Sequence, residues 1–229
     1  MCGRYSQTLP KNDLQKRFGF KESHLELRLR YNIAPGQKAP VVVDEGQRVL
    51  RLMRWGLAPS WMKDPQAKEG LINARAETLL QKPSFKKPFL QSRCLVLADG
   101  FYEWVKREGG RTKAPMRFVL KTREPFAFAG LWDLWTKRGL DGFRSFTIVT
   151  TKASGFLASY HERMPVILRK EDEALWLDPD LKDPEKLNPM LQAHSADEME
   201  AYEVSPLVNS PLNDVSACLD ALASFGRPT

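Results

Sequence analysis

Alternating apolar and polar positions predict strands over much of the chain. Residues 47–55, QRVLRLMRW, alternate with the period of two that a half-buried strand shows. Residues 94–105, CLVLADGFYEWV, indicate two extended segments separated by Asp99-Gly100, which is a turn signal. Further strands are predicted at 115–120, 126–135, 143–150 and 199–205, and residues 139–142 suit a hairpin loop.

Helical patterns are shorter and fall between groups of strands. They predict a short helix at 11–20, a helix or helix end at 154–163 before Pro165, and helices at 171–177 and 184–194. Because strands and helices do not alternate regularly, we expect an α+β fold rather than a doubly wound one. The expected sheet is mainly antiparallel, with a barrel-like core and flanking helices. The 229 residues allow a single domain, with its core at about 2–215 and a less ordered tail at 216–229.

Composition is that of an ordinary soluble protein, with 42% apolar and 28% charged residues. No segment approaches the roughly 20 apolar residues that cross a bilayer, and the N-terminal sequence MCGRYSQTLPKND lacks the apolar centre of a signal peptide. We therefore expect a cytoplasmic protein without membrane contact. The net charge of +7 favours polyanionic partners, but it also suits a protein that is merely kept soluble by its charges.

Three cysteines are present, and their number and spacing exclude the usual cysteine frameworks. An odd count without a C-x-x-C motif argues against both a disulfide framework and a four-ligand zinc site. Cys94 lies in an apolar run and Cys218 in a C-terminal helical pattern, so both are expected in the core. Phosphate-binding glycine motifs are absent from the sequence as well, and we expect neither a metal nor a cofactor.

Cys2 differs from the other cysteines because of its position. Methionine is commonly removed before a small second residue, and its removal would leave a cysteine with a free α-amine. The reference pKa of such an amine is near 7.8, against about 10.4 for lysine, so more of it is uncharged and nucleophilic at pH 7. An aldehyde can form a Schiff base with the amine, and the neighbouring sulfur can then close a thiazolidine ring. The plain alternative is a cysteine in a frayed terminus.

Six motifs together resemble one family, the SOS response-associated peptidases (SRAP), also described as abasic-site processing proteins. In chain order they are MCGRY (1–5), YNIAPGQ (31–37), RWGLAPSW (54–61), INARAET (72–78), ADGFYEW (98–104) and HERMPVIL (161–168). The resemblance implies that Cys2 links to the ring-opened aldehyde of an abasic site in single-stranded DNA. It also implies catalytic roles for Asn73, Glu103 and His161.

The chemistry of these three residues agrees with the implied roles. Aromatic neighbours of Glu103 should raise its carboxyl pKa by desolvation and make it a proton donor. His161, with a pKa near neutral, suits opening of the deoxyribose ring, and Asn73 can orient the Cys2 amine or a sugar oxygen. Without the motifs, these residues would be interpreted as a solvent-facing strand glutamate, a histidine at a helix C-terminus and a turn-forming asparagine.

A DNA-binding surface is expected around the same motifs. Three arginines lie within two residues of a proposed catalytic residue and are expected to hold the DNA backbone, although they could also be scattered surface charges. Three tryptophans offer faces for base stacking, although aromatic residues are more often core and at least one of them can be buried. The expected set comprises Arg4, Asn32, Pro35, Trp55, Gly56, Trp61, Arg75, Trp104 and Arg163, in which Asn32 and Pro35 shape a loop through backbone contacts.

The resulting hypothesis is a DNA-damage protein that crosslinks covalently to abasic sites in single-stranded DNA and protects the strand from cleavage. It is expected to be monomeric and associated with the nucleoid, with replication-fork proteins as further partners. Two alternatives stay open at this stage. One is a hydrolase, with Cys2 as nucleophile and its own amine as base, which could also remove Met1 by autoproteolysis. The other is a non-catalytic module that binds single-stranded DNA.

Overall fold

Five strands close into a barrel in the computed structural model, which describes residues 2–63, 70–106, 113–137 and 140–222. Hydrogen-bonded pairs run in the order β10-β4-β3-β6-β9, and β9 pairs with β10 again. Two short strands, β5 and β11, also pair with β10. The bounds are β3 Lys38–Asp44, β4 Arg48–Trp55, β5 Asn73–Arg75, β6 Arg93–Ala98, β9 Phe126–Lys137, β10 Leu140–Lys152 and β11 Arg163–Pro165.

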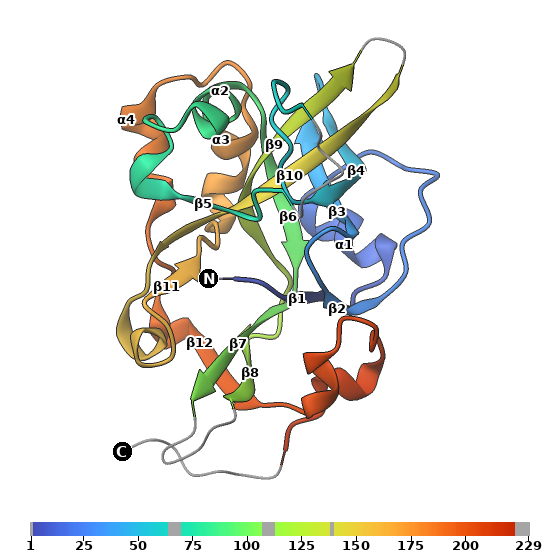
Figure 1. Ribbon diagram of the computed structural model, residues 1–229, viewed down its shortest axis with the longest axis vertical. Coiled ribbons are helices and arrows are strands. Elements are labelled where there is room, and N and C mark those ends of the chain that lie inside the picture. The colour runs from blue at the N-terminus through green and yellow to red at the C-terminus, as the bar shows by residue number, and fades with distance from the viewer. Residues whose placement is uncertain (1, 64–69, 107–112, 138–139, 223–229) are drawn as a thin grey trace.

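A second sheet has five strands in the order β12-β8-β7-β1-β2. All of its pairs are antiparallel, and only β10 makes parallel pairs in the first sheet, with β4 and β5. In Figure 1, β1 crosses the middle of the molecule, with β7 and β8 below it. The strands are β1 Tyr5–Gln7, β2 Arg30–Ile33, β7 Gly100–Lys106, β8 Lys113–Leu120 and β12 Met199–Glu203. The predicted α+β class, mainly antiparallel and barrel-like, is confirmed.

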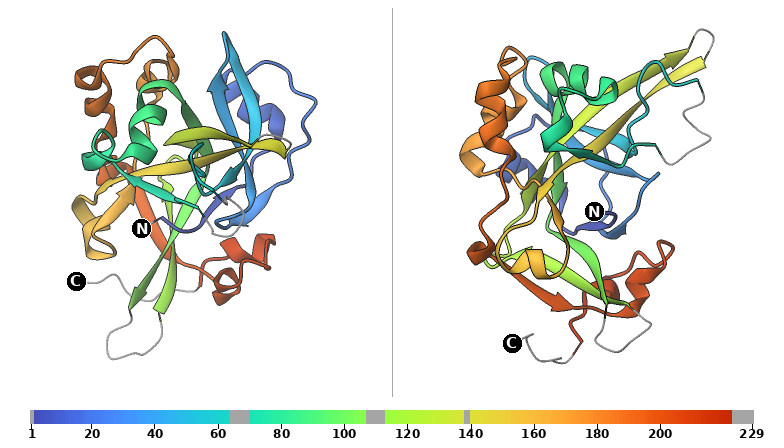
Figure 2. Two further views of the ribbon diagram at one scale, coloured as in Figure 1. Left: turned by 45° about the horizontal axis from the view of Figure 1, so that its top comes forward. Right: turned by 60° about the vertical axis from the view of Figure 1, so that its left-hand side comes forward.

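The described residues form four α-helices that flank the barrel, and each of them contributes to the apolar cluster on its outer face (Figures 1 and 2). They are α1 Lys11–Phe18, α2 Pro83–Gln91, α3 Glu173–Leu177 and α4 Pro184–Leu187. Helix α1 ends at Gly19, whose φ of 66° lies in the left-handed region that glycine adopts easily. The predicted helix at 184–194 is wrong in length, because α4 gives way to a 3-10 segment, Asn188–Leu191, that contains Pro189.

Two apolar clusters lie on opposite faces of the barrel strands. Leu95 and Leu97 of β6 pack with Phe18, Phe89 and Trp176 of the helices, so their face is the outer one. The alternate residues of β6 belong to a second cluster, which also contains Trp55, Phe128, Phe146 and two residues of the N-terminal segment, Cys2 and Tyr5. Because successive strand residues point to opposite faces, this second cluster fills the barrel interior. The N-terminal segment therefore packs against the inside of the barrel.

Most of the predicted strands are confirmed, with changes at their ends. The predicted break at Asp99-Gly100 is confirmed, with Asp99 between β6 and β7 and Gly100 as the first residue of β7, and there the chain passes from the barrel to the second sheet. In the predicted 139–142 loop, residue 139 lies outside the described residues and β10 already begins at Leu140. The 154–163 segment forms a 3-10 helix, Gly155–Ser159, before β11.

The C-terminal segment packs against the second sheet as far as it is described. Residues 216–222 fall in the expected tail, yet Ser216–Leu219 form a 3-10 helix and Ala221 bridges Val204. Cys218 is buried there and Cys94 is buried in β6, both as predicted. Within the described residues, no helix has the length and apolar character needed to cross a membrane.

Candidate active site

Cys2 lies three residues before the internal strand β1 and is fully buried, so it is not in a loose terminus. Strand β1 pairs with β7 on one side and with β2 on the other. The register places Tyr5 opposite Phe101, and the amide of Tyr102 donates to the Arg4 carbonyl at 2.9 Å. Continuing this antiparallel register places Gly3 opposite Glu103, one residue from Cys2, and the Glu103 carboxylate is close enough to act on the charge of the Cys2 thiol. The alternative of a frayed terminal cysteine is therefore wrong for this chain.

Asn73 contacts the main chain of Cys2 directly. Its Nδ2 donates to the Cys2 carbonyl at 2.8 Å, from β5 beside Ile148 of β10. Its Oδ1 is buried and accepts no hydrogen bond from any part of the chain that the structure describes. Asn73 thus fixes the position of Cys2 and keeps one buried acceptor oxygen next to it.

Charge and burial determine the protonation states of Cys2 and Glu103. Burial raises the pKa of the Cys2 thiol well above its usual value, and the nearby Glu103 carboxylate raises it further. The thiol is therefore protonated at neutral pH. Glu103 is only 8% exposed, and burial raises its pKa to about 7 against the opposing charge of the chain's amino terminus. The predicted upward shift of Glu103 is confirmed, and half of the groups carry a proton near pH 7.

His161 follows the 3-10 helix and is positioned by the backbone of Arg163. Its Nδ1 lies 2.9 Å from the Arg163 amide nitrogen and 3.0 Å from the Arg163 carbonyl oxygen. The neutral ring, with its proton on Nε2, can accept from the amide, and the protonated ring can donate to the carbonyl. Burial lowers the pKa of His161, and the positive charge of the amino terminus lowers it further, so the neutral ring dominates at pH 7.

Arg4 and Asn32 form part of an internal clamp on the C-terminal segment. Nη1 of Arg4 donates to Asn32 Oδ1 at 2.6 Å and to the Val208 carbonyl at 2.7 Å, and the guanidinium lies 5.4 Å from the ring centre of Trp104. Asn32 is fully buried, and its Nδ2 lies within hydrogen-bonding distance of three carbonyl oxygens, those of Val208, Ser210 and Asn213. Its backbone amide donates to Asp214. Asn32 thus shapes this part of the chain through contacts with backbone carbonyls of segment 208–213, and its role in DNA binding stays a prediction.

The other two arginines differ in exposure. Arg163 makes a two-pronged ion pair with Glu77 and bonds to Thr150, and its side chain is 11% exposed. Arg75 lies on the same side of the barrel and is exposed. Arg75 is therefore accessible to a phosphate as the structure stands, whereas Arg163 is already engaged by an acidic side chain.

The three tryptophans of the predicted surface lie in three different environments. Trp55 is fully buried, stacks with Phe146 inside the barrel, and donates from Nε1 to the Ile72 carbonyl at 2.9 Å. Trp61 is 64% exposed, and Trp104 is half-buried, with Nε1 donating to Asn209 at 2.7 Å. Base stacking on Trp55 is therefore wrong, since no base can reach its ring, while Trp61 offers an open face.

Gly56 and Pro35 lie beside Trp55 but are not equally accessible. Gly56 is buried with a φ of 123°, and its carbonyl oxygen would be 2.5 Å from a Cβ placed on Gly70. This close approach leaves no room for a side chain on Gly70, and DNA contact by the buried Gly56 stays a prediction. Pro35 is half-buried in a loop fixed by the Gly36 amide, which donates to the Trp55 carbonyl at 2.7 Å.

Sequence reasoning missed the polar residues that support the site. Asp99 is buried and accepts from Ser6 Oγ at 2.5 Å, from the Thr8 amide at 2.6 Å and from Arg117 Nη2 at 3.0 Å. Asp99 and Glu77 both lie inside motifs that were recognised, ADGFYEW and INARAET. An acidic residue without an assigned role inside each motif was the signal that could have indicated these two supporting residues. Among the described residues, no group of three His, Cys, Asp or Glu side chains is arranged to hold a metal.

The site thus combines Cys2 inside the barrel with Asn73 on its carbonyl and Glu103 near its thiol. The family model described as SOS response associated peptidase (SRAP) matches residues 1–211. The chain therefore belongs to the SOS response-associated peptidase family, and the resemblance seen in the motifs is confirmed.

Named relatives and a solved structure agree with this assignment. The chain is 44% identical over 217 residues to the abasic site processing protein YoqW of Bacillus subtilis (strain 168), covering 93% of this chain and 96% of that protein. It is 33% identical over 262 residues to the abasic site processing protein HMCES of Gallus gallus, covering 96% and 77%. A crystal structure of a protein from Bacteroides thetaiotaomicron matches with a TM-score of 0.82 at 26% identity, covering 96% of this chain and all of that one.

Proposed function

We propose that this protein captures abasic sites in single-stranded DNA by forming a thiazolidine with Cys2 after Met1 is removed. The observation that carries the proposal is the arrangement around Cys2. Asn73 holds its carbonyl at 2.8 Å, and the Glu103 carboxylate is close enough to raise the pKa of its thiol. The names of the relatives YoqW and HMCES support abasic DNA as the substrate.

Glu103 can transfer protons in both halves of the reaction. The Cys2 amine adds to the aldehyde carbon and gives a carbinolamine. Protonated Glu103 donates to the carbinolamine hydroxyl, which leaves as water, and a cationic imine remains. The resulting carboxylate takes the thiol proton as the sulfur bonds to the imine carbon. One water is lost overall, and Glu103 ends in its initial state.

The raised thiol pKa fits this order of steps. A protonated thiol leaves the amine as the first nucleophile, and the sulfur becomes reactive only when a base has formed beside it. The buried Oδ1 of Asn73 can accept from the Cys2 amine or from a sugar hydroxyl. Neutral His161, in the tautomer that donates from Nδ1 to the Arg163 carbonyl, can accept the proton of the anomeric hydroxyl at Nε2 and then return it to the ring oxygen as the deoxyribose opens.

The alternatives draw less support from this geometry. A hydrolase that attacks through the Cys2 sulfur needs a thiolate, whereas burial raises the pKa of this thiol. Asn73 donates to the carbonyl of Cys2, which is not the carbonyl that removal of Met1 would attack. A module that only binds DNA has no use for a buried carboxyl with a pKa of about 7 beside Cys2.

The test is intact mass spectrometry and denaturing electrophoresis with an abasic single-stranded oligonucleotide. We expect a product of protein without Met1 plus oligonucleotide minus one water, with the strand uncleaved. Cys2→Ala should abolish this product, and Cys218→Ala, which alters another buried cysteine, should retain it. An adduct that survives in Cys2→Ala, or strand cleavage as the main product, would reject the proposal.

A further inference from the structure

The hydrogen-bonding capacity of Arg163 is almost fully used inside the protein. Its Nη1 and Nη2 each donate to one carboxylate oxygen of Glu77 at 3.0 Å. Nη2 also donates to the Thr150 carbonyl at 2.6 Å, and Nε lies 3.4 Å from Thr150 Oγ1. A guanidinium has five N–H groups, so one, on Nη1, is left by these contacts. A two-pronged contact with a phosphate needs two.

Glu77 lies on the solvent side of this ion pair. Its side chain is 49% exposed, compared with 11% for Arg163. The Arg163 hydrogen bond lowers the pKa of Glu77, and the charge of Arg75 lowers it further, so the carboxylate is ionised at neutral pH. A phosphate approaching Arg163 from solvent therefore meets a negative charge first.

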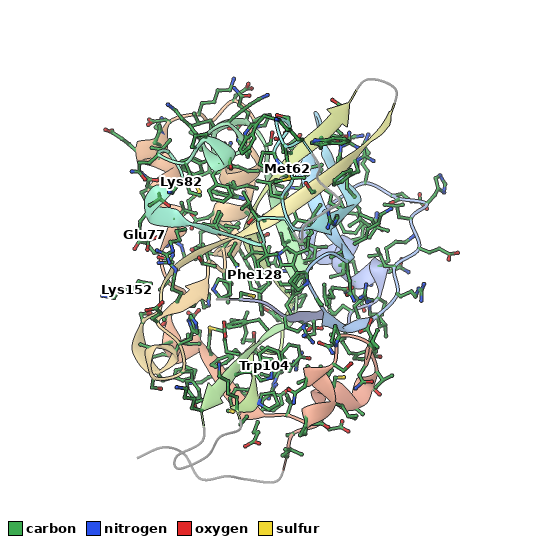
Figure 3. All side chains as sticks on the ribbon, in the orientation of Figure 1. Met62, Glu77, Lys82, Trp104, Phe128 and Lys152 are labelled. Carbon is green, nitrogen blue, oxygen red and sulfur yellow. The ribbon has the colours of Figure 1, made fainter. Side chains whose placement is uncertain are left out.

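The surroundings of Glu77 are otherwise positive. Figure 3 shows Glu77 and Lys152 at the same edge of the molecule, and Lys152 pairs in register with Arg163 between β10 and β11. Arg75 is exposed two residues before Glu77. This edge adjoins the candidate active site, because the backbone of Arg163 contacts His161 Nδ1. One carboxylate thus lies among basic side chains at the position where the DNA backbone is expected.

We propose that Glu77 is an internal counter-ion of Arg163 that a backbone phosphate displaces when single-stranded DNA binds. The inference rests on the proposed function for the identity of the ligand. When the phosphate replaces Glu77, Arg163 loses only its contacts with the carboxylate, because its hydrogen bonds to Thr150 can keep the guanidinium in place. The consequence is that the protein binds any single strand, damaged or not, more weakly than it would without the Glu77 carboxylate. Intact DNA is then released readily, whereas abasic DNA is retained by its covalent bond.

The test compares Glu77→Gln with Glu124→Gln as a matched control. Each variant removes one negative charge from a half-exposed ion pair, and Glu124 pairs with Lys170 at 2.7 Å away from the motifs of the site. Fluorescence anisotropy would measure binding of a single-stranded oligonucleotide that carries a tetrahydrofuran abasic analogue, which has no aldehyde, at several salt concentrations.

We expect Glu77→Gln to bind about two- to fivefold more tightly than Glu124→Gln at low salt. The slope of log affinity against log salt should differ by less than about 0.7, the value for one phosphate contact on a single strand, because Arg163 contacts the phosphate in both proteins. The gain should disappear in the Arg163→Gln background, where the counter-ion has no partner. Equal or weaker binding by Glu77→Gln relative to the control would overturn the proposal, as would a gain that persists without Arg163.

Covalent capture is measured separately with an oligonucleotide that carries a true aldehyde. Tighter binding of the analogue by Glu77→Gln without any covalent product in the wild type would support the counter-ion and reject the thiazolidine chemistry. A normal covalent product, together with unchanged binding of the analogue by Glu77→Gln, would support the thiazolidine chemistry and reject the counter-ion. If neither the wild type nor Glu77→Gln binds the analogue, single-stranded DNA is not the ligand and the counter-ion proposal is rejected.

Discussion

Replacing Asn32 with alanine removes the central side chain of the clamp on the C-terminal segment. Its Nδ2 lies 2.7 Å from the Asn213 carbonyl oxygen and 2.9 Å from that of Ser210, and its Oδ1 accepts from Arg4 at 2.6 Å. A buried hydrogen bond contributes about 1 kcal/mol, and one to a charged group about 1.5–3 kcal/mol. Val208 retains its own bond from Arg4. The expected loss in free energy of unfolding is therefore about 3 kcal/mol.

Urea denaturation of Asn32→Ala would measure this loss, and a thermal melt should show a decrease of about 6–12 °C in Tm. The control is Asn12→Ala, the same substitution at an exposed position of α1, which should change stability by less than about 0.5 kcal/mol. Hydrogen exchange should also increase in residues 205–214 of the Asn32 variant alone. If Asn32→Ala lies within about 1 kcal/mol of Asn12→Ala, the clamp does not hold the segment as described.

Two further predictions concern Glu103 and the tryptophans. Because the folded state raises the Glu103 pKa from 4.5 to about 7, the native protein binds more protons than the unfolded chain between these values, and stability should fall as pH rises through them. The full loss in free energy of unfolding is about 3 kcal/mol above pH 7, and Glu103→Gln should abolish this pH dependence. If urea denaturation gave identical pH profiles for the wild type and Glu103→Gln, the raised pKa would be contradicted. Trp61→Ala should weaken single-strand binding by about 1–3 kcal/mol in anisotropy titrations without loss of stability, whereas Trp55→Ala should lower stability by about 3–5 kcal/mol. Unchanged DNA affinity in Trp61→Ala would exclude base stacking on that ring.

The sequence could predict features that depend on local pattern. The alternation in β4 predicted a strand, and the glycine after α1 agrees with the observed helix end. The same alternation also predicts that Trp55 is buried, because Trp55 lies two residues after Met53 and shares its buried face. Trp61 lies after the end of the strand, so the alternation of strand faces does not predict its exposure. One motif therefore supplied both a core residue and an exposed ring.

Partners far apart in the sequence could not be predicted in the same way. The carbonyl partners of Asn32 Nδ2 lie 176 to 181 residues further along the chain, and Glu77 lies 86 residues before Arg163. No local pattern indicates that an arginine beside a catalytic motif already has a carboxylate partner. Arg4, Arg163 and Asn32 were therefore assigned to DNA when part of their bonding capacity was already used by the protein.

The relation between Cys2 and Glu103 depends on the register of β1 against β7. A slip of one residue would turn every side chain of β1 to the opposite face and move Cys2 away from Glu103. Three residues oppose such a slip at the other end of β1, where buried Asp99 accepts from Ser6 and from Arg117 Nη2, each at 3.0 Å or less. Removing one partner of this buried ion pair would leave the other charge without compensation, which is among the most costly changes in a protein interior. The N-terminal segment is therefore positioned by strand pairing and a buried charge pair, whereas a terminal segment on a sheet edge would fray.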